Sequence, residues 1–406
     1  MVTQTRTGVP ASARIDPGEF VENGYTIVRN IIPPDQLDAL RAGFEMQFEK
    51  QRLIETARRK PDDRPANWWE NSRQRRVLPE KTVDEQSAHV IDFLLGAPQE
   101  ISRQVMRAPH VSLFIFNSLN NPVRETGPDP WHRDPNSAHV APLEGLINDL
   151  VENGAAAQVQ WNVPLYDDPT LWVVPGSHRR LNTPEEDRQL REDPRQALPG
   201  GTPVELRAGD GVVYTNLLLH WGSFYTPRLL RRTFHFGYRS FGGPMWPYFP
   251  LRYWGLEFTQ HLSPSARSSF EQFAAWHAAE LEDVAATLRA AANKNGVAFE
   301  AGLSKLHAGE QGRVVVVTLL DRMVQRLGAY ADPSFASRPA AEQANAVGGD
   351  GVHLAQFQDI ARRFTPAELG TLLERFATVH DRQRVGATYL DTMPVDFGVA
   401  EFMASW

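Results

Sequence analysis

The chain has 406 residues, of which 42% are apolar and 22% charged, a composition typical of a soluble globular protein with a main domain and an appendage, or with two domains. It contains no cysteine, which excludes disulfides, iron–sulfur clusters, thiolate metal sites and cysteine nucleophiles, so any bound metal must be held by nitrogen and oxygen atoms. The net charge of −7 gives no general attraction to nucleic acid or to an anionic membrane surface.

Residues 1–16 are polar and small, and we interpret them as a mobile leader. They lack the apolar run of a signal peptide. No stretch of the sequence approaches the length that spans a bilayer, and we therefore expect a cytoplasmic location. Residues 18–24 predict a short helix with Gly24 in its C-cap position, followed by a strand over residues 25–28.

Two polar stretches predict surface loops. Residues 52–76 combine many arginines with Trp68 and Trp69, which indicates either a solvated loop anchored by two tryptophans or a lid that contacts an anionic substrate. Residues 182–200 are charged and rich in proline, and we interpret them as a surface insertion.

Residues 17–255 form the predicted β domain. Many short strands are separated by Gly, Pro and Asp turns without alternating helices, which favours a double-sheet antiparallel barrel over a parallel α/β fold. In the strand predicted over residues 156–165, Gln158, Gln160 and Asn162 share one face. Such a polar stripe can line a wet cavity, although exposure to solvent explains it equally well. Further strands are predicted over residues 111–117, 171–174, 212–216 and 231–238.

The sequence pattern changes in residues 256–406, which are predicted to form a mostly helical C-terminal extension without a chemistry-bearing motif. Ser263 is the expected N-cap of a long helix that begins with proline, and a capping box at Thr365 predicts another helix. Residues 314–328 could form a helix, although their four consecutive valines alone would indicate a strand. Residues 332–351 are interpreted as a linker rich in alanine and glycine.

The chemical motif of the chain is a His-x-Asp step at His132 and Asp134. In an extended segment these two side chains point to the same side, so the imidazole and the carboxylate could bind one ion together. Such a triplet also arises by chance in a chain with twelve histidines. A second histidine would complete the two-histidine, one-carboxylate set that non-haem iron oxygenases and some zinc enzymes use.

His220 is the candidate third ligand, although a lone histidine at the end of an apolar strand is more often a core residue. Arg231 lies eleven residues further on, at the start of the next predicted strand. Because a guanidinium offers a rigid fork to a carboxylate and stays charged when desolvated, Arg231 suits the far carboxylate of a dicarboxylate cosubstrate. A metal at one end of a cavity and an arginine at the other end would fit 2-oxoglutarate.

Several segments together resemble the phytanoyl-CoA dioxygenase family of iron(II)/2-oxoglutarate-dependent oxygenases over residues 18–240. These segments are residues 19–25, His132-x-Asp134, residues 174–178, and the stretch from Gly209 through His220 to Arg231. The resemblance implies a mainly β core, a double-stranded β-helix (jelly roll, cupin-like), with flanking helices. It implies that His132, Asp134 and His220 hold Fe(II) and that Arg231 binds the distal carboxylate of 2-oxoglutarate. Tyr238, seven residues after Arg231, keeps the family's spacing.

Some positions depart from the family pattern. The family usually has His-Gly-Ser at the distal ligand, with the serine touching 2-oxoglutarate, whereas this chain has the longer sequence His220-Trp221-Gly222-Ser223. Ser223 is therefore a candidate cosubstrate contact that needs testing, and Arg232 is a second candidate for the clamp. Asn117 is a further candidate for lining the cosubstrate pocket, whereas His178 is interpreted as a structural residue of its turn.

These features predict an Fe(II)/2-oxoglutarate-dependent dioxygenase that uses O2, hydroxylates a small organic metabolite and releases succinate and CO2. The carboxylate of Asp134 disfavours halogenation, whereas desaturation or ring formation would use the same residues. The alternatives are a cupin-like isomerase or hydrolase without 2-oxoglutarate and a catalytically silent binding protein. Trp68, Trp69, Trp221 and Phe224 favour an apolar or ring-bearing substrate. We expect no nucleic-acid or membrane partner, and the C-terminal helices could form a dimer contact.

Overall fold

The computed structural model describes residues 15–60, 62, 69, 75–134, 142–242, 255–349, 351–383 and 395–406. Residues 1–14 of the predicted leader and Trp68 of the predicted loop lie outside the described residues. The chain separates into a sheet unit (residues 1–134, 158–240 and 256–272) and a helical unit (residues 135–157, 241–255 and 273–406). These bounds differ from the predicted boundary after residue 255. Residues 135–157 and 241–255 group with the helical unit, and residues 256–272 group with the sheet unit.

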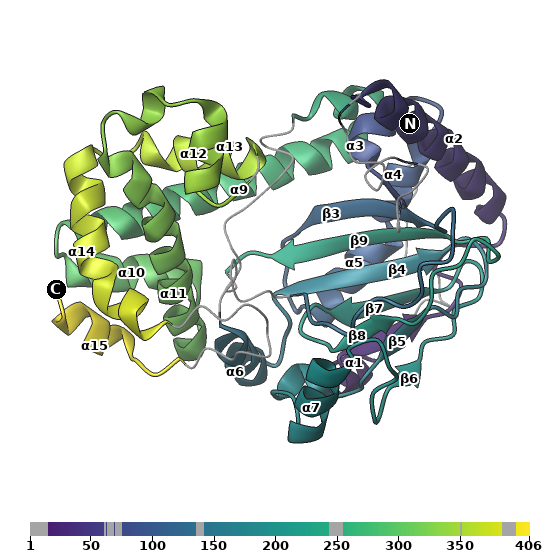
Figure 1. Cartoon of the computed structure of the whole chain (residues 1–406), viewed down its shortest axis with the longest axis horizontal. Helices are drawn as coiled ribbons and strands as arrows, with labels where there is room; N and C mark the ends of the chain where they lie inside the picture. The colour runs from purple at the N-terminus through teal and green to yellow at the C-terminus, as the bar shows by residue number, and fades with distance from the viewer. Residues whose placement is uncertain are drawn as a thin grey trace, which may run out of the picture. The chain divides into compact units, whose positions relative to one another are not determined.

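The sheet unit contains two antiparallel sheets, whose strands are drawn as arrows in Figure 1. The larger sheet has the order β1-β7-β4-β9-β3-β2, and the smaller has the order β6-β5-β8. The larger sheet comprises β1 (Tyr25–Val28), β7 (Gly211–Thr215), β4 (Gln158–Pro164), β9 (Arg232–Ser240), β3 (Val111–Asn120) and β2 (Arg75–Val77). The smaller sheet comprises β6 (Thr202–Pro203), β5 (Leu171–Val173) and β8 (His220–Gly222).

Strand β4 shows how the sequence divides the larger sheet into an apolar and a polar face. Val159 and Trp161 are fully buried, and the indole nitrogen of Trp161 donates a hydrogen bond of 2.9 Å to the hydroxyl of Ser102 in α5 (Ala97–Val105). Because successive side chains of a strand alternate between faces, Gln160 and Asn162 point to the opposite side. Both amides are nevertheless buried, so the predicted polar stripe is not a solvent-exposed surface.

Apolar side chains from both sheets form one core cluster. Leu171 and Val173 of β5 pack with Val212 and Tyr214 of β7, and all four are buried. Burying an aliphatic side chain of this size stabilises a fold by about 1.5–3 kcal/mol. This packing holds the smaller sheet against the larger one and so fixes the position of β8, which begins with His220.

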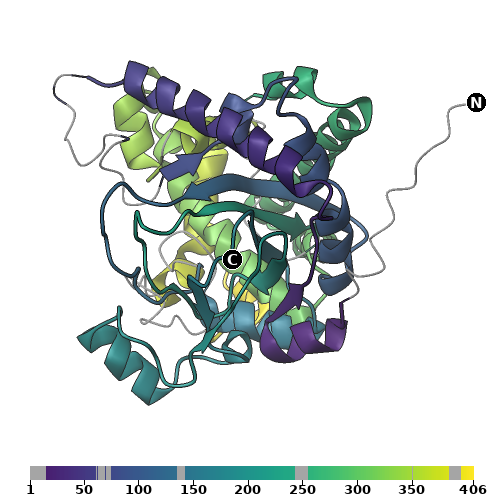
Figure 2. The ribbon, with the colours of Figure 1, turned by 90° about the vertical axis from the view of Figure 1, so that its right-hand side faces the viewer.

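The helices of the sheet unit confirm the predicted N-terminal pattern. Helix α1 (Pro17–Asn23) is capped by the carboxylate of Asp16, and Gly24 ends it with a φ of +82°, a left-handed conformation that glycine adopts without strain. The long helix α2 (Leu37–Ala57), purple in Figure 2, runs across the strands of this unit. The other α-helices are α3 (Pro79–Thr82), α4 (His89–Leu94) and α7 (Pro184–Glu192), and the 3-10 helices are η4 (Ser177–Arg179) and η5 (Glu257–His261).

The predicted surface insertion over residues 182–200 contains a regular helix. Thr183 and Glu186 form a capping box at the start of α7, in which each side chain binds the other residue's backbone nitrogen. None of the helices in the described ranges combines the length and the apolar character needed to cross a bilayer.

The helical unit is built from α-helices over most of its described residues. The valine run of residues 314–317 lies inside α11, so the strand alternative is wrong, and the linker predicted over residues 332–351 includes α12. The capping box at Thr365 is confirmed at the start of α14. The elements are α6 (Leu143–Asn153), α10 (Gly296–Leu306), α11 (Glu310–Leu327), η6 (Gly328–Ala331), η7 (Phe335–Ser337), α12 (Ala340–Ala346), α13 (Gly351–Ala361), α14 (Pro366–Arg382) and α15 (Val399–Ala404), and the long helix α9 (Pro264–Ala292) begins in the sheet unit and continues here.

Candidate functional site

A single antiparallel β-bridge brings two distant histidines together. The backbone nitrogen of His132 donates to the carbonyl of His220 at 3.0 Å, and the nitrogen of His220 donates back at 2.9 Å. Residues that exchange both hydrogen bonds lie directly opposite each other with their side chains on the same face. The two imidazole rings are accordingly 4.3 Å apart between centroids.

Asp134 completes a cluster of three ligand atoms. Its backbone nitrogen donates to the carbonyl of Asn216 at 3.1 Å, which fixes the chain two residues after His132. Its Oδ1 lies 3.9 Å from Nε2 of His132 and 3.8 Å from Nε2 of His220. One donor atom from each of the three residues lies within 4.8 Å of the others, a spacing that suits a shared metal ion. The structure thus brings together all three residues predicted as metal ligands.

Hydrogen bonds orient each of these side chains. Nδ1 of His132 lies 2.9 Å from the carbonyl of Pro130, and Nδ1 of His220 lies 2.9 Å from the carbonyl of Leu218. A carbonyl only accepts, so each Nδ1 carries the proton, and the Nε2 lone pair is left for a metal. The amide of Gln160 donates to Oδ2 of Asp134 and leaves Oδ1 facing the histidines.

Burial keeps His220 in the form that binds metals. Its side chain is 7% exposed, and burial, together with the neighbouring His132, lowers its pKa from 6.5 to about 4. A neutral imidazole is therefore the stable form at neutral pH, and only the neutral ring offers a lone pair on Nε2.

The three ligand atoms open into a cavity of about 160 Å³ between the two sheets. The larger sheet contributes Gln160 and Asn162 from β4 and His235 from β9. Nδ1 of His235 lies 2.7 Å from the side-chain oxygen of Asn162, which fixes the orientation of both groups. The smaller sheet contributes Leu171 and His220. The larger sheet therefore lines the cavity with several polar side chains, and the smaller sheet contributes one of the three candidate metal ligands, His220.

Arg231 supplies the cationic side chain of the cavity. It immediately precedes β9, and its side chain is only 6% exposed. Its Nε donates to Oδ2 of Asp168 at 2.8 Å, and its guanidinium lies 5.3 Å from the ring centre of Tyr225. Its Nη1 is buried and has no hydrogen-bond partner among the described residues. A buried guanidinium nitrogen without a partner is costly, so this atom is ready to bind an anion.

A family model described as phytanoyl-CoA dioxygenase (PhyH) matches residues 20–224, which is half of the chain. The chain belongs to the phytanoyl-CoA dioxygenase family. The matched segment contains all three candidate metal ligands, and Arg231 lies seven residues beyond its end. A search among curated proteins finds no match.

The similar solved structures include an alpha-ketoglutarate-dependent carbocyclase and a protein solved with 2-oxoglutarate. AviO1 from Streptomyces viridochromogenes Tue57 has 23% identity and a TM-score of 0.41, over 55% of this chain and 93% of that one. The non-haem alpha-ketoglutarate-dependent carbocyclase SnoK from nogalamycin biosynthesis has 20% identity and a TM-score of 0.40, over 58% and 88%. EctD from S. alaskensis, solved with 2-oxoglutarate and 5-hydroxyectoine, has 14% identity and a TM-score of 0.37, over 57% and 78%.

The structure distinguishes Arg231 from Arg232, the two candidates for the anion clamp. Arg231 lines the cavity, whereas Arg232 points to Glu45, with Nε 2.6 Å from the carboxylate, and packs over the ring of Phe48. Adjacent residues in an extended segment face opposite sides, so only one of the two can reach the cavity. Arg231 is therefore the candidate anion clamp of this family member.

Ser223 does not line the cavity, contrary to the prediction. Its hydroxyl donates to the carbonyl of Thr170 at 2.9 Å, while His220 and Gly222 line the cavity. Because alternate residues share a face, the extra residue Trp221 moves the serine from the inner to the outer side. Asn117 is not a lining residue either; the lining residue from its strand, β3, is Leu119.

The other predicted residues have structural surroundings. His178 is 1% exposed and its Nε2 bonds the carbonyl of Val21 at 3.1 Å, which confirms its structural interpretation. Three of the aromatic residues proposed to contact substrate are described, and none of them lines the cavity: Trp69 packs on Phe48, Trp221 stacks on Trp131, and Phe224 is not a lining residue. Tyr214 and Tyr225 do line the cavity, so its aromatic side chains are not the ones predicted.

Sequence reasoning missed several residues of this family member's site. Asp168, Tyr214 and Tyr225 surround Arg231, and His235 lines the cavity beside Asn162. Nothing in the local sequence marks Asp168, because an Asp-Asp-Pro segment indicates only a turn. His235 could have been found by alternation along its strand, since it shares the parity of Arg231.

Proposed function

We propose that the chain is an Fe(II)/2-oxoglutarate-dependent dioxygenase that hydroxylates a small organic metabolite in the cytoplasm. The proposal rests on one observation: a two-histidine, one-carboxylate cluster shares its cavity with a buried arginine whose Nη1 has no partner among the described residues. The two sheets with the cavity between them support a jelly-roll topology for this core. Desaturation and ring formation need the same site and remain within the proposal.

The donor set fits ferrous iron. Two neutral imidazole nitrogens and one carboxylate oxygen can occupy one face of an octahedron and leave the opposite face for other ligands. The carbonyls of Pro130 and Leu218 hold both imidazoles with Nε2 toward the cluster, and Gln160 holds Asp134. Loss of such a hydrogen bond to a metal ligand typically lowers metal affinity by roughly ten- to a hundredfold. We therefore assign the metal to His132, Asp134 and His220.

The cavity also fits the cosubstrate. Its volume of about 160 Å³ leaves room for a small molecule between the metal ligands and Arg231, which suits a compact dianion. Arg231 would bind the distal carboxylate with its Nη atoms, because its Nε is already bonded to Asp168. Iron held by these residues would allow O2 to act as the oxidant, and 2-oxoglutarate would supply two of the electrons as it is converted to succinate and CO2.

One observation favours the second candidate, a cupin-like metalloenzyme without 2-oxoglutarate. Arg231 already has a counter-ion in Asp168, so its charge is compensated without a bound anion. An isomerase or hydrolase would need the metal ligands but not the free Nη1 of Arg231. The two candidates therefore differ in whether an anion occupies the arginine end of the cavity.

The test is coupled turnover of 2-oxoglutarate by the full chain. Purified protein loaded with Fe(II) should convert 2-oxoglutarate to succinate in the presence of O2, slowly without substrate and faster with the correct metabolite from a screen. The His220→Ala variant should abolish both reactions. A protein that binds iron but neither binds nor consumes 2-oxoglutarate would contradict the proposal and favour the metalloenzyme without a cosubstrate.

A further inference from the structure

Asp168 lies behind Arg231 and outside the cavity. Its carboxylate is 7% exposed and accepts three hydrogen bonds. Oδ2 accepts from Nε of Arg231 at 2.8 Å and from the hydroxyl of Thr233 at 3.0 Å, and Oδ1 accepts from the backbone nitrogen of Thr170 at 2.9 Å. Thr170 and Arg231 line the cavity, but Asp168 does not.

We propose that Asp168 is the positioning residue of the cosubstrate site: it binds the Nε edge of Arg231 and thereby directs the Nη atoms toward the distal carboxylate of 2-oxoglutarate. This inference depends on the proposed function, because it assigns the occupant of the arginine end of the cavity. Asp168 itself does not touch the bound anion, but it should influence the affinity of the site for anions that reach Arg231.

The geometry of a guanidinium explains this effect. Its donors lie in one plane, so a strong hydrogen bond at Nε sets the direction of both Nη groups. A free arginine side chain loses about 2 kcal/mol of rotamer entropy when it is immobilised, and a prepositioned one has already lost it. Thr233 and Thr170 hold the carboxylate from two sides, so the support itself is fixed.

The backbone around Asp168 is also held in place. Its nitrogen donates to the carbonyl of Leu206 at 2.9 Å, and the carboxylate of Asp167 accepts from the backbone nitrogen of Ala208 at 2.9 Å. Residues 167 and 168 are therefore hydrogen-bonded to residues 206 and 208.

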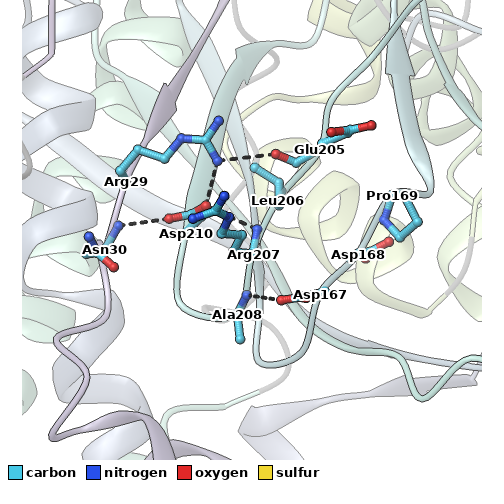
Figure 3. A pocket seen from close by; sticks show the side chains of 10 residues that line it. All are labelled: Arg29, Asn30, Asp167, Asp168, Pro169, Glu205, Leu206, Arg207, Ala208 and Asp210. Atoms are coloured by element: carbon cyan, nitrogen blue, oxygen red, sulfur yellow. Dashed lines mark hydrogen bonds and ion pairs between the residues drawn. The ribbon is translucent and has the colours of Figure 1, made fainter.

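A second aspartate–arginine pair, in which the aspartate is buried and the arginine is half exposed, provides a control. Asp210 accepts from Arg29 at 2.6 Å and from the backbone nitrogens of Asn30 and Arg207. This pair and the outer side of Asp168 line an open pocket of about 790 Å³, whose lining residues are drawn in Figure 3. Asp210 is 3% exposed and, like Asp168, combines one arginine with backbone donors. Its arginine does not line the cavity with the metal cluster, so it should not affect cosubstrate binding.

The experiment compares two 2-oxo acids on the iron-loaded full chain under anaerobic conditions. 2-Oxoglutarate carries the distal carboxylate, whereas pyruvate has the same 2-oxo acid group without it. Isothermal titration calorimetry should show that Asp168→Asn weakens binding of 2-oxoglutarate about tenfold. The neutral amide loses the charge-assisted hydrogen bond to Arg231, and its NH2 group faces one of the groups that donate to the carboxylate in the wild type. Binding of pyruvate and of iron should stay within about twofold of wild type. Asp210→Asn should change none of these affinities.

Three outcomes decide the proposal. Thr233→Val, which removes one donor to the same carboxylate oxygen, should show a smaller selective loss of about threefold and serves if Asp168→Asn does not fold. Equal loss of 2-oxoglutarate and pyruvate, or unchanged 2-oxoglutarate affinity in both variants, would overturn the role of Asp168. Wild-type protein that binds 2-oxoglutarate no better than pyruvate would overturn the proposed function itself.

Discussion

Replacing Arg231 by methionine separates its structural role from its role toward the cosubstrate. Arg231 and Asp168 are 6% and 7% exposed and 2.8 Å apart, so they form a buried ion pair. Removing one partner of such a pair costs about 3–5 kcal/mol, because the remaining charge is buried without compensation. We expect Arg231→Met to lose about that much free energy of unfolding at pH 7, a large part of the roughly 5–15 kcal/mol of a typical domain.

The double variant Arg231→Met/Asp168→Asn tests the cause of this loss. Removing both charges leaves no uncompensated ion, so we expect it to recover at least half of the lost free energy of unfolding. Neither variant can clamp a distal carboxylate. Both should therefore lose about 1.5–3 kcal/mol of binding free energy for 2-oxoglutarate, or about 10- to 150-fold in affinity.

The stability loss of Arg231→Met should depend on pH in a defined direction. Burial alone would raise the pKa of Asp168, but the guanidinium of Arg231 and the hydrogen bonds from Thr170 hold the pKa below its usual value. Without Arg231, burial raises the pKa above its value in the unfolded chain. The buried carboxyl then destabilises the folded state at high pH, because a group whose pKa is raised by folding must lose its proton there at a cost in free energy of unfolding. The deficit against wild type should grow between pH 5 and pH 8, roughly.

Urea unfolding followed by circular dichroism at both pH values measures these differences, and calorimetry measures 2-oxoglutarate binding. A single variant as stable as wild type at pH 7, or a double variant no more stable than the single one, would refute the ion-pair reasoning. Unchanged 2-oxoglutarate affinity in both variants would refute the clamp.

Other substitutions test the metal cluster and a buried histidine. Asp134→Ala should abolish iron binding, measured as iron content after dialysis, and with it succinate formation; retained iron and activity would contradict the ligand assignment. Gln160→Leu, which removes the bond to Asp134, should weaken iron binding about tenfold in a chelator competition without unfolding the protein. Burial lowers the pKa of His178 from 6.5 to about 4, so the unfolded chain takes up a proton that the folded chain does not over this range. Stability should therefore fall by about 3 kcal/mol as pH drops from 6.5 to 4, and His178→Gln, whose amide can still donate to Val21, should show a shallower fall in urea unfolding.

The sequence contained enough to predict two of the ligands from one short motif. His132 and Asp134 are two residues apart, so their geometry follows from strand alternation alone. His220 was joined to them through Arg231, eleven residues later, and through the family resemblance, since nothing local predicts the β-bridge between positions 132 and 220. Helical periodicity and capping likewise predicted the ends of several helices. The valine run in α11 was ambiguous because a short apolar run fits a buried helix and a strand equally well.

The remaining parts of the site could not be predicted, because they depend on register and on distant partners. A single extra residue, Trp221, reverses which side of the chain Ser223 occupies, and a family pattern carried over by position cannot show that reversal. Asp168 lies 63 residues before Arg231 and joins it only once the two sheets have packed. A motif identifies groups that bind a ligand directly, whereas the group that orients the binder is selected by the fold. The affinity of this site for an anion should therefore depend on a residue that no binding motif contains.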